Sequence, residues 1–178
     1  MNIFGGKTAK KDKIIILIDF ENATKGTTTK SIEGGFDAVD MLNPNFGGII
    51  TECAERGEVV FAAAFGPNIR SNIYDELCDL GYLVCVSPPG EGKDFGRVDR
   101  NLMKTGMKVF QNMEVDEVVV VSDDGDMLEL YNEALMRGIK VTVLEVHRLN
   151  FSVKTRKEIN VGEMPTSVTK GSSVIDRR

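Results

Sequence analysis

The sequence has few of the residues on which several common chemistries depend. Its 178 residues include no tryptophan, one histidine and three cysteines. The histidine, His147, lies beyond the last predicted strand and is expected at the surface, so no serine–histidine or cysteine–histidine nucleophile is predicted. Cys53, Cys78 and Cys85 are odd in number and form no CxxC pair, which argues against a disulfide framework and a zinc site. We therefore expect a reduced, cytoplasmic protein with buried thiols.

Long apolar segments are also missing. No apolar run approaches the ~20 residues that span a bilayer, and residues 1–7 lack the apolar core of a signal peptide. We expect no membrane partner. A hydrophobic content of 42% with 28% charged residues is ordinary for a globular protein, and the length suits one domain with a substantial core.

The formal net charge is -5, but it is unevenly distributed. Residues 1–13 carry four lysines against one aspartate, and residues 148–178 carry seven basic residues against three acidic ones. The acidic excess therefore lies between them. An acidic centre with basic ends fits a cation site flanked by arms for a phosphate backbone. Solubilising termini are the alternative, and the tails alone would favour it.

Two all-apolar runs, residues 13–19 and 118–121, indicate strands that are buried on both faces of a parallel sheet. Other segments alternate between strand and helix patterns. Further strands are predicted at residues 58–65, 82–86 and 139–144, and helices at residues 45–55, 68–80, 97–112 and 127–137. This alternation predicts a three-layer α/β/α sandwich with a mainly parallel, Rossmann-like sheet of about five strands.

The remaining segments complete the domain organisation. Residues 23–31 are predicted to be a loop, residues 32–46 are ambiguous, and residues 149–163 add a short helix or strand. The folded domain is expected to cover residues 13–165. A flexible basic arm at residues 1–12 and a disordered tail at residues 166–178 would flank it.

Carboxylates follow the predicted strands. Asp19 ends the first strand, three aspartates follow residues 118–121, and Asp99 begins the helix at residues 97–112. Right-handed crossovers bring the carboxyl ends of parallel strands to one edge, where open α/β folds bind their ligands. A single aspartate at such a place is more simply a helix cap. Several carboxylates in one cleft repel one another unless a cation neutralises them.

Oxygen-only ligands suit a hard ion such as Mg²⁺ or Mn²⁺. Such an ion polarises a phosphodiester and generates hydroxide from bound water. The carboxylates therefore point to metal-dependent chemistry on phosphate esters.

Four short motifs then follow in a fixed order. They are Asp-x-x-Asn at residues 19–22, Lys93 in a loop before Val-Asp at residues 98–99, a strand that runs into Ser-Asp-Asp-Gly-Asp-Met at residues 122–127, and Gly-x-x-Val at residues 138–141. In order, spacing and element type, residues 13–147 resemble the NYN family, nucleases of the PIN-like superfamily. The resemblance implies a PIN-like fold.

The resemblance further implies a metal-dependent ribonuclease, and we expect an endonuclease that cleaves RNA. Asp19, Asp99, Asp124 and Asp126 would hold Mg²⁺ or Mn²⁺, with one ion expected rather than two. Asn22 would complete the catalytic set by hydrogen-bonding a ligand carboxylate or a metal-bound water.

The same resemblance suggests two substrate-binding residues, and a loop that is longer than a minimal family member needs suggests two more. Ser122 would bond a ligand carboxylate or a substrate phosphate, and Lys93 would contact phosphate from its loop. Lys25 and Lys30 would contact substrate from a long loop at residues 23–43, for which a plain surface loop is an equal alternative.

The chain departs from the family pattern at three positions. Asp123 and Met127 replace a glycine and a phenylalanine, and Thr105 stands where many members have another acid. Threonine cannot replace a carboxylate, and Glu21, Asp94 or Asp123 are the candidates for the missing charge.

The alternative function is therefore a weak or inactive member of the family that binds RNA or protein. A Toprim-like site is a weaker alternative, since it explains neither the Asp-x-x-Asn motif nor Asp99. A receiver domain is weaker still, because its lysine after the last strand is absent. The expected partner is RNA, and a homodimer is left open.

Overall fold

The computed structural model describes residues 10–24, 45–67, 69, 71–87, 96–122, 124–146 and 153–159. The strands are β1 (Asp12–Asp19), β2 (Gly57–Gly66), β3 (Leu83–Val86), β4 (Glu117–Val121), β5 (Lys140–Val146) and β6 (Val153–Ile159). The helices are α1 (Phe20–Thr24), α2 (Phe46–Arg56), α3 (Ser71–Asp79), α4 (Arg97–Asn112) and α5 (Leu128–Met136), with a short 3-10 helix at Gly125–Met127.

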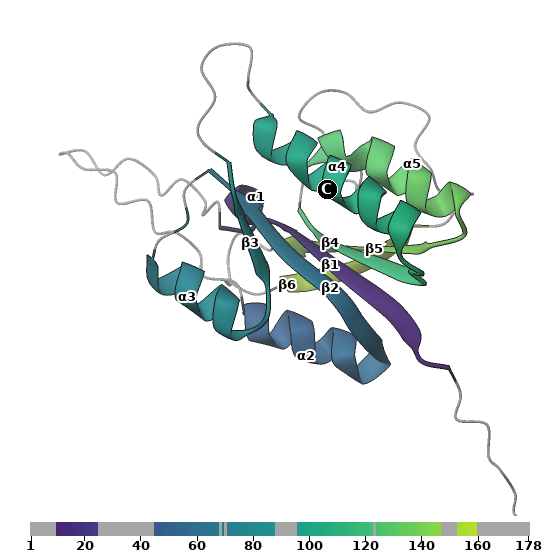
Figure 1. Cartoon of the computed structure of the whole chain (residues 1–178), viewed down its shortest axis with the longest axis horizontal. Coiled ribbons are helices and arrows are strands. Elements are labelled where there is room, and N and C mark those ends of the chain that lie inside the picture. Colours follow the sequence, from purple (N-terminus) through teal and green to yellow (C-terminus); the bar gives the residue numbers. More distant parts are fainter. Residues whose placement is uncertain are drawn as a thin grey trace, which may run out of the picture.

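The strands form one sheet in the order β3-β2-β1-β4-β5-β6 (Figure 1). The first five are parallel, and β6 runs antiparallel to β5. The mainly parallel sheet is thus confirmed, with six strands instead of about five. The extra strand lies in the segment at residues 149–163 for which the sequence left helix and strand open.

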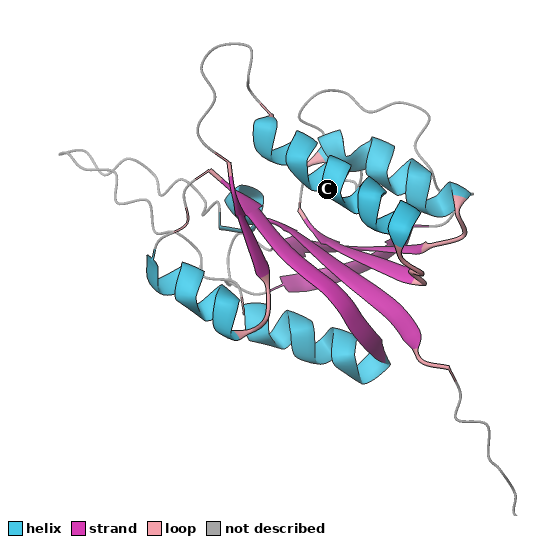
Figure 2. Ribbon diagram, viewed as in Figure 1, coloured by secondary structure: helices cyan, strands magenta, loops and turns pink. Residues whose placement is uncertain are grey.

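Helices cover both faces of the sheet, as the three-layer prediction requires. Figures 1 and 2 show α2 and α3 against one face and α4 and α5 against the other. Side chains alternate between the two layers along β1, where Ile16 packs with the α2 and α3 layer and Leu17 with the α4 and α5 layer. Residues 14–18 and 118–121 are 0% exposed, because these two strands are central and covered on both faces.

Several predicted boundaries were wrong by a few residues. Residues 23 and 24 continue α1 instead of starting a loop, and Thr24 Oγ1 donates to Phe20 O at 2.7 Å. Helix α3 begins at Ser71, although the pattern predicted a start at residue 68. Ile69 precedes α3, but its side chain also packs against the core. Its apolar position therefore matched the spacing of the helix and moved the predicted start too early.

The prediction of buried thiols is only partly right. Cys53 is buried and Cys85 is half-buried, but Cys78 is exposed on α3. Among the described residues, no helix is long and apolar enough to cross a membrane.

Helix α4 brings its first turn to the carboxyl edge of the sheet. Gly96 precedes it with φ 78°, a left-handed conformation that favours glycine, and no side chain caps the helix. Asn101 Nδ2 donates to Ser87 Oγ at 2.8 Å, and the buried Ser87 donates its backbone N–H to Gly66 O at 2.8 Å. These bonds tie the start of α4 to the ends of β2 and β3.

The opposite, amino edge of the sheet holds a buried ion pair. Arg56 Nη1 donates to the two carboxylate oxygens of Glu117 at 2.6 and 2.7 Å, and Thr142 Oγ1 donates to Glu117 at 2.7 Å. The Glu117 side chain is 5% exposed, so these partners compensate for its burial.

Candidate metal centre

Asp19 is the last residue of β1 and is 1% exposed. Its Oδ1 accepts the backbone N–H of Asn22 at 3.2 Å, and its Oδ2 accepts from Ser122 Oγ at 3.1 Å. The Asn22 side-chain amide also donates to Oδ2. A buried carboxylate needs such donors, and here they fix its orientation.

Asp124 follows β4 and caps the short 3-10 helix. Its Oδ1 accepts the backbone N–H of Asp126 at 3.0 Å. Its own N–H donates to Ser122 Oγ at 3.1 Å, while the same hydroxyl donates to Asp19. Ser122 therefore connects two of the predicted carboxylates directly.

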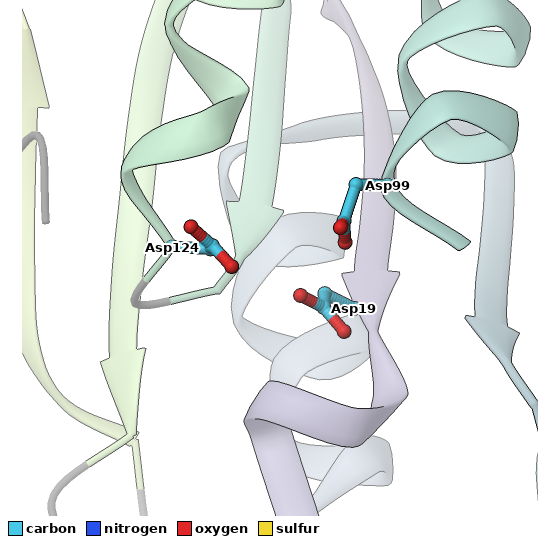
Figure 3. Close-up of side chains that lie close together, drawn as sticks. All are labelled: Asp19, Asp99 and Asp124. Carbon is cyan, nitrogen blue, oxygen red and sulfur yellow. The ribbon is translucent and has the colours of Figure 1, made fainter. Parts of the chain in front are cut away.

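Asp99 reaches the edge from the first turn of α4. It does not cap the helix, because Gly96 occupies that position. Its half-buried side chain instead points toward the end of β1, opposite Asp124 (Figure 3).

Asp19, Asp99 and Asp124 together form the candidate metal centre. Each contributes one carboxylate oxygen, and these three oxygens lie within 4.8 Å of one another. An ion with oxygens at about 2.1 Å separates adjacent ligands by roughly 3 Å and opposite ligands by roughly 4 Å. A small side-chain movement would therefore let all three oxygens share one hard cation, and the donor set fits the ion that the sequence predicted.

The electrostatics of the cluster favour a cation. Burial raises the pKa of Asp19, although hydrogen bonds from Asn22 and Ser122 partly offset the rise. Burial and then the nearby charges of Asp19 and Asp124 raise the pKa of Asp99 to about 6. Ionising all three carboxylates without a counter-ion is therefore unfavourable, and a bound cation would remove this cost.

Two further predicted residues lie beside this cluster. Asn22 makes the hydrogen bond to a candidate ligand carboxylate that the sequence predicted. Asp126 is exposed and lies outside the set of three, although its charge and that of Glu21 contribute to the raised pKa of Asp99. The other predicted positions lie outside the described residues: Lys25, Lys30, Lys93, Asp94, Asp123 and His147.

Position 105, where many family members carry another acid, is a threonine on α4. Thr105 is half-buried there, and the next residue, Gly106, is buried. A Cβ atom added at Gly106 would lie 2.7 Å from Leu130 Cδ1 and 3.0 Å from Leu17 Cδ1. Helix α4 therefore packs closely on the sheet and on α5 at Gly106, and Thr105 beside it carries no carboxylate.

Sequence reasoning missed Asn101 and Ser87. They hold the turn that carries Asp99, yet neither belongs to a motif or an apolar pattern. Only the contact between α4 and the end of β3 reveals their role.

The parallel sheet, its two helical layers and the carboxylates at its edge define an α/β domain of the kind found in PIN-like nucleases. The NYN domain model matches residues 13–160, and the chain belongs to the NYN domain family. NYN domains are a family of PIN-like nucleases, so the resemblance found in the sequence is confirmed. No curated protein is a significant match to the sequence.

Solved structures resemble the chain in fold. A protein of unknown function from Vibrio parahaemolyticus is 24% identical with a TM-score of 0.60, covering 81% of this chain and 87% of that one. The C-terminal domain of a Pyrococcus furiosus hydrogenase is 17% identical with a TM-score of 0.48, covering 76% and 92%. The Vibrio structure supports the fold assignment alone.

Proposed function

We propose that the protein is a metal-dependent endoribonuclease that uses one Mg²⁺ or Mn²⁺ ion. The observation that carries the proposal is the convergence of Asp99 and Asp124 on the buried carboxylate of Asp19. Membership of a nuclease family supplies the reaction class. An oxygen-ligated divalent ion would supply a Lewis acid for the phosphodiester and a more acidic water.

The residues of the chain have distinct roles in this proposal. Asp19, Asp99 and Asp124 bind the ion, and Asn22 and Ser122 fix the orientation of Asp19 through their hydrogen bonds. Asp126 is close enough to influence Asp99 and would accept a proton or bond a water at the exposed side of the site.

The substrate assignments are proposals of the same kind. RNA as substrate follows from the family resemblance, and phosphate contacts by Lys25, Lys30 and Lys93 remain predictions. So does a cytoplasmic location, while a homodimer stays open.

The direct test is cleavage of an internally labelled single-stranded RNA with Mg²⁺ or Mn²⁺. We expect wild-type cleavage that stops on chelation, and a loss of at least about 100-fold in Asp19→Asn and Asp124→Asn. A matched control is Asp79→Asn at the exposed end of α3, which should retain full activity. Unchanged cleavage in both site variants would contradict the proposal.

A non-catalytic RNA-binding module is the second candidate function. The observation that favours it is the threonine at position 105, where many family members have another acid. Metal-independent RNA binding without cleavage of any tested RNA would support this candidate over the nuclease.

A further inference from the structure

Helix α4 differs in charge from the other described helices. It carries four basic residues and one acid, Asp99. Helix α3 has three acids and no base, α5 has two acids and no base, and α2 has two acids and one base. The short α1 has one acid and no base. The positive charge of α4 is therefore not a general property of this surface.

The four basic residues of α4 occupy one line along the helix. They are Arg97, Arg100, Lys104 and Lys108, whose spacing of three, four and four places them on one helical face. We call this line the basic ridge. Arg100, Lys104 and Lys108 are exposed and Arg97 is half-buried. The opposite face is buried in the core through Leu102, Gly106, Val109 and Phe110.

The basic ridge begins in the helical turn that carries Asp99. It runs for about 16 Å at 1.5 Å per residue, with successive cations roughly one turn, about 5.4 Å, apart. Figure 1 shows α4 in an outer helical layer, and the exposure of Arg100, Lys104 and Lys108 places the ridge at the surface of the described part of the chain. A linear polyanion that lies along the ridge would reach the candidate metal centre at one end.

The chemistry of the surrounding surface limits the kind of partner. The exposed residues of α4 between its first turn and its end are polar: Arg100, Asn101, Lys104, Lys108, Gln111 and Asn112. A protein partner would require apolar or aromatic anchors, and the exposed residues of the helix offer none. The exposed Met113 lies only past the end of α4, beyond the ridge. A phosphate backbone requires only regularly spaced cations and hydrogen-bond donors.

A cationic surface also answers an electrostatic problem of the site. The candidate metal centre has three carboxylates and the whole chain has a formal charge of -5, so a polyanionic substrate is repelled at long range. Local cations beside the site would offset this repulsion.

We propose that the basic ridge of α4 binds the phosphodiester backbone of a single-stranded nucleic acid and guides it to the candidate metal centre. The proposal deepens the proposed nuclease function and rests on it for the identity of the substrate. The ridge contacts phosphates and not bases, so its contribution to affinity is independent of sequence.

The test measures binding separately from cleavage. Fluorescence anisotropy would follow a labelled 12-nucleotide single-stranded RNA, and a DNA of the same sequence, in an Asp124→Asn background with Mg²⁺. The test variant is Lys104→Gln/Lys108→Gln. The control is Arg137→Gln/Lys140→Gln, which removes equal charge from two exposed residues near the start of β5, at the opposite edge of the sheet.

We expect the ridge variant to bind either nucleic acid about 5- to 10-fold more weakly at 100 mM salt. The slope of the logarithm of the association constant against the logarithm of the salt concentration should become less steep by about 1.4, which corresponds to two lost phosphate contacts on a single strand. The control should stay within about 2-fold. All four substituted residues are exposed, so the ridge variant should keep the wild-type melting temperature. The control also loses the surface pair between Arg137 and Glu133, which contributes little to stability, so its melting temperature should fall only slightly.

Equal weakening in both variants would assign the effect to net charge and overturn the proposal, as would unchanged binding in the ridge variant or no binding by the parent protein. The nuclease assay is read independently. If the protein cleaves RNA but the ridge variant binds as the parent does, only the ridge proposal is contradicted. If binding depends on the ridge but no RNA is cleaved, only the proposed nuclease function is contradicted.

Discussion

At the residue scale, Asp19 and Asp124 each combine a helix-capping role with a place in the candidate metal centre. Both cap the helical turn that follows their strand, which is the simplest reading of an aspartate at such a place. Both also direct an oxygen into the cluster shared with Asp99. Capping and metal binding are therefore not alternatives here, because each carboxylate has a second oxygen or lone pair for the other task.

The sequence could predict that the three carboxylates meet, because Asp19 and Asp124 follow parallel strands and Asp99 begins the helix after a third, which places all three at the carboxyl edge. It could not show that Asp126 lies outside the set of three, because the direction of that side chain depends on the 3-10 turn at Gly125–Met127, where the pattern predicted only a helix from residue 127. It also could not show that Ser122 connects Asp19 to Asp124, since the serine hydroxyl can face a carboxylate or a phosphate equally well.

The raised pKa of Asp99 predicts how stability depends on pH. Without metal, folded Asp99 holds its proton up to about pH 6, whereas the unfolded side chain ionises near 3.8. The folded state therefore binds more protons between these values, and stability falls as pH rises through them. The raised pKa of Asp19 acts in the same direction.

Asp99→Asn removes this titration. We expect the metal-free variant to be more stable than the wild type by about 1 kcal/mol at pH 7, after allowance for solvent screening of a half-exposed group. The free energies of unfolding of the two proteins should become equal near pH 4.

Metal should reverse this pH dependence. Mn²⁺ should raise the melting temperature of the wild type more at pH 7 than at pH 5, and should not raise that of the variant. Thermal melts with and without Mn²⁺ measure both effects, and a wild type that gains stability between pH 4 and 6 without metal would contradict them.

At the scale of elements, apolar periodicity predicted the strands and helices that are buried. It failed for an element whose position does not depend on burying its own side chains. Strands β1 and β4 were recognised because both faces are covered and every side chain is apolar. Strand β6 has the sequence Val-Lys-Thr-Arg-Lys-Glu-Ile, which lacks apolar alternation, and its place follows from antiparallel pairing with β5. Such an edge strand is specified by its partner more than by its own residues.

Helix α4 is held at the site by a side-chain hydrogen bond, which predicts a role for Asn101 in positioning Asp99. Asn101→Ala should weaken Mn²⁺ binding about 10-fold and lower the free energy of unfolding by only about 1 kcal/mol. Ser87→Ala should have the same effect, and the double variant should add little to either.

The matched control is Asn112→Ala at the far end of the same helix. It removes a hydrogen bond from the Asn112 amide to Lys108 O at 2.6 Å. Mn²⁺ titration calorimetry should show unchanged affinity in this control. An equal loss of affinity in Asn101→Ala and Asn112→Ala would show that general loosening of α4 is responsible.

At the scale of the whole molecule, the two edges of the sheet are predicted to have separate roles. The carboxyl edge holds three mutually repelling carboxylates, and the amino edge holds Glu117 hydrogen-bonded to Arg56 and Thr142. The carboxylates that destabilise the metal-free fold thus lie at the proposed functional site, and the ion pair that stabilises the fold lies at the opposite edge of the sheet.

Glu117→Gln should therefore destabilise the fold and leave metal binding intact. Leaving Arg56 without its buried partner should lower the free energy of unfolding by about 2–4 kcal/mol in urea denaturation. The control Glu133→Gln breaks an i,i+4 pair with Arg137 that is about one-third exposed, and should cost about 0.5 kcal/mol or less. A large change in Mn²⁺ affinity in folded Glu117→Gln would contradict the separation of the two edges.

The central claim is that Asp19, Asp99 and Asp124 share a divalent cation. The most direct measurement is an anomalous difference map from crystals soaked in Mn²⁺ and collected near the manganese edge. We predict a peak about 2.2 Å from one oxygen of each carboxylate, absent in crystals of Asp99→Asn. A map without a peak among the three carboxylates at pH 7 and millimolar Mn²⁺, with the wild-type fold intact, would contradict the claim.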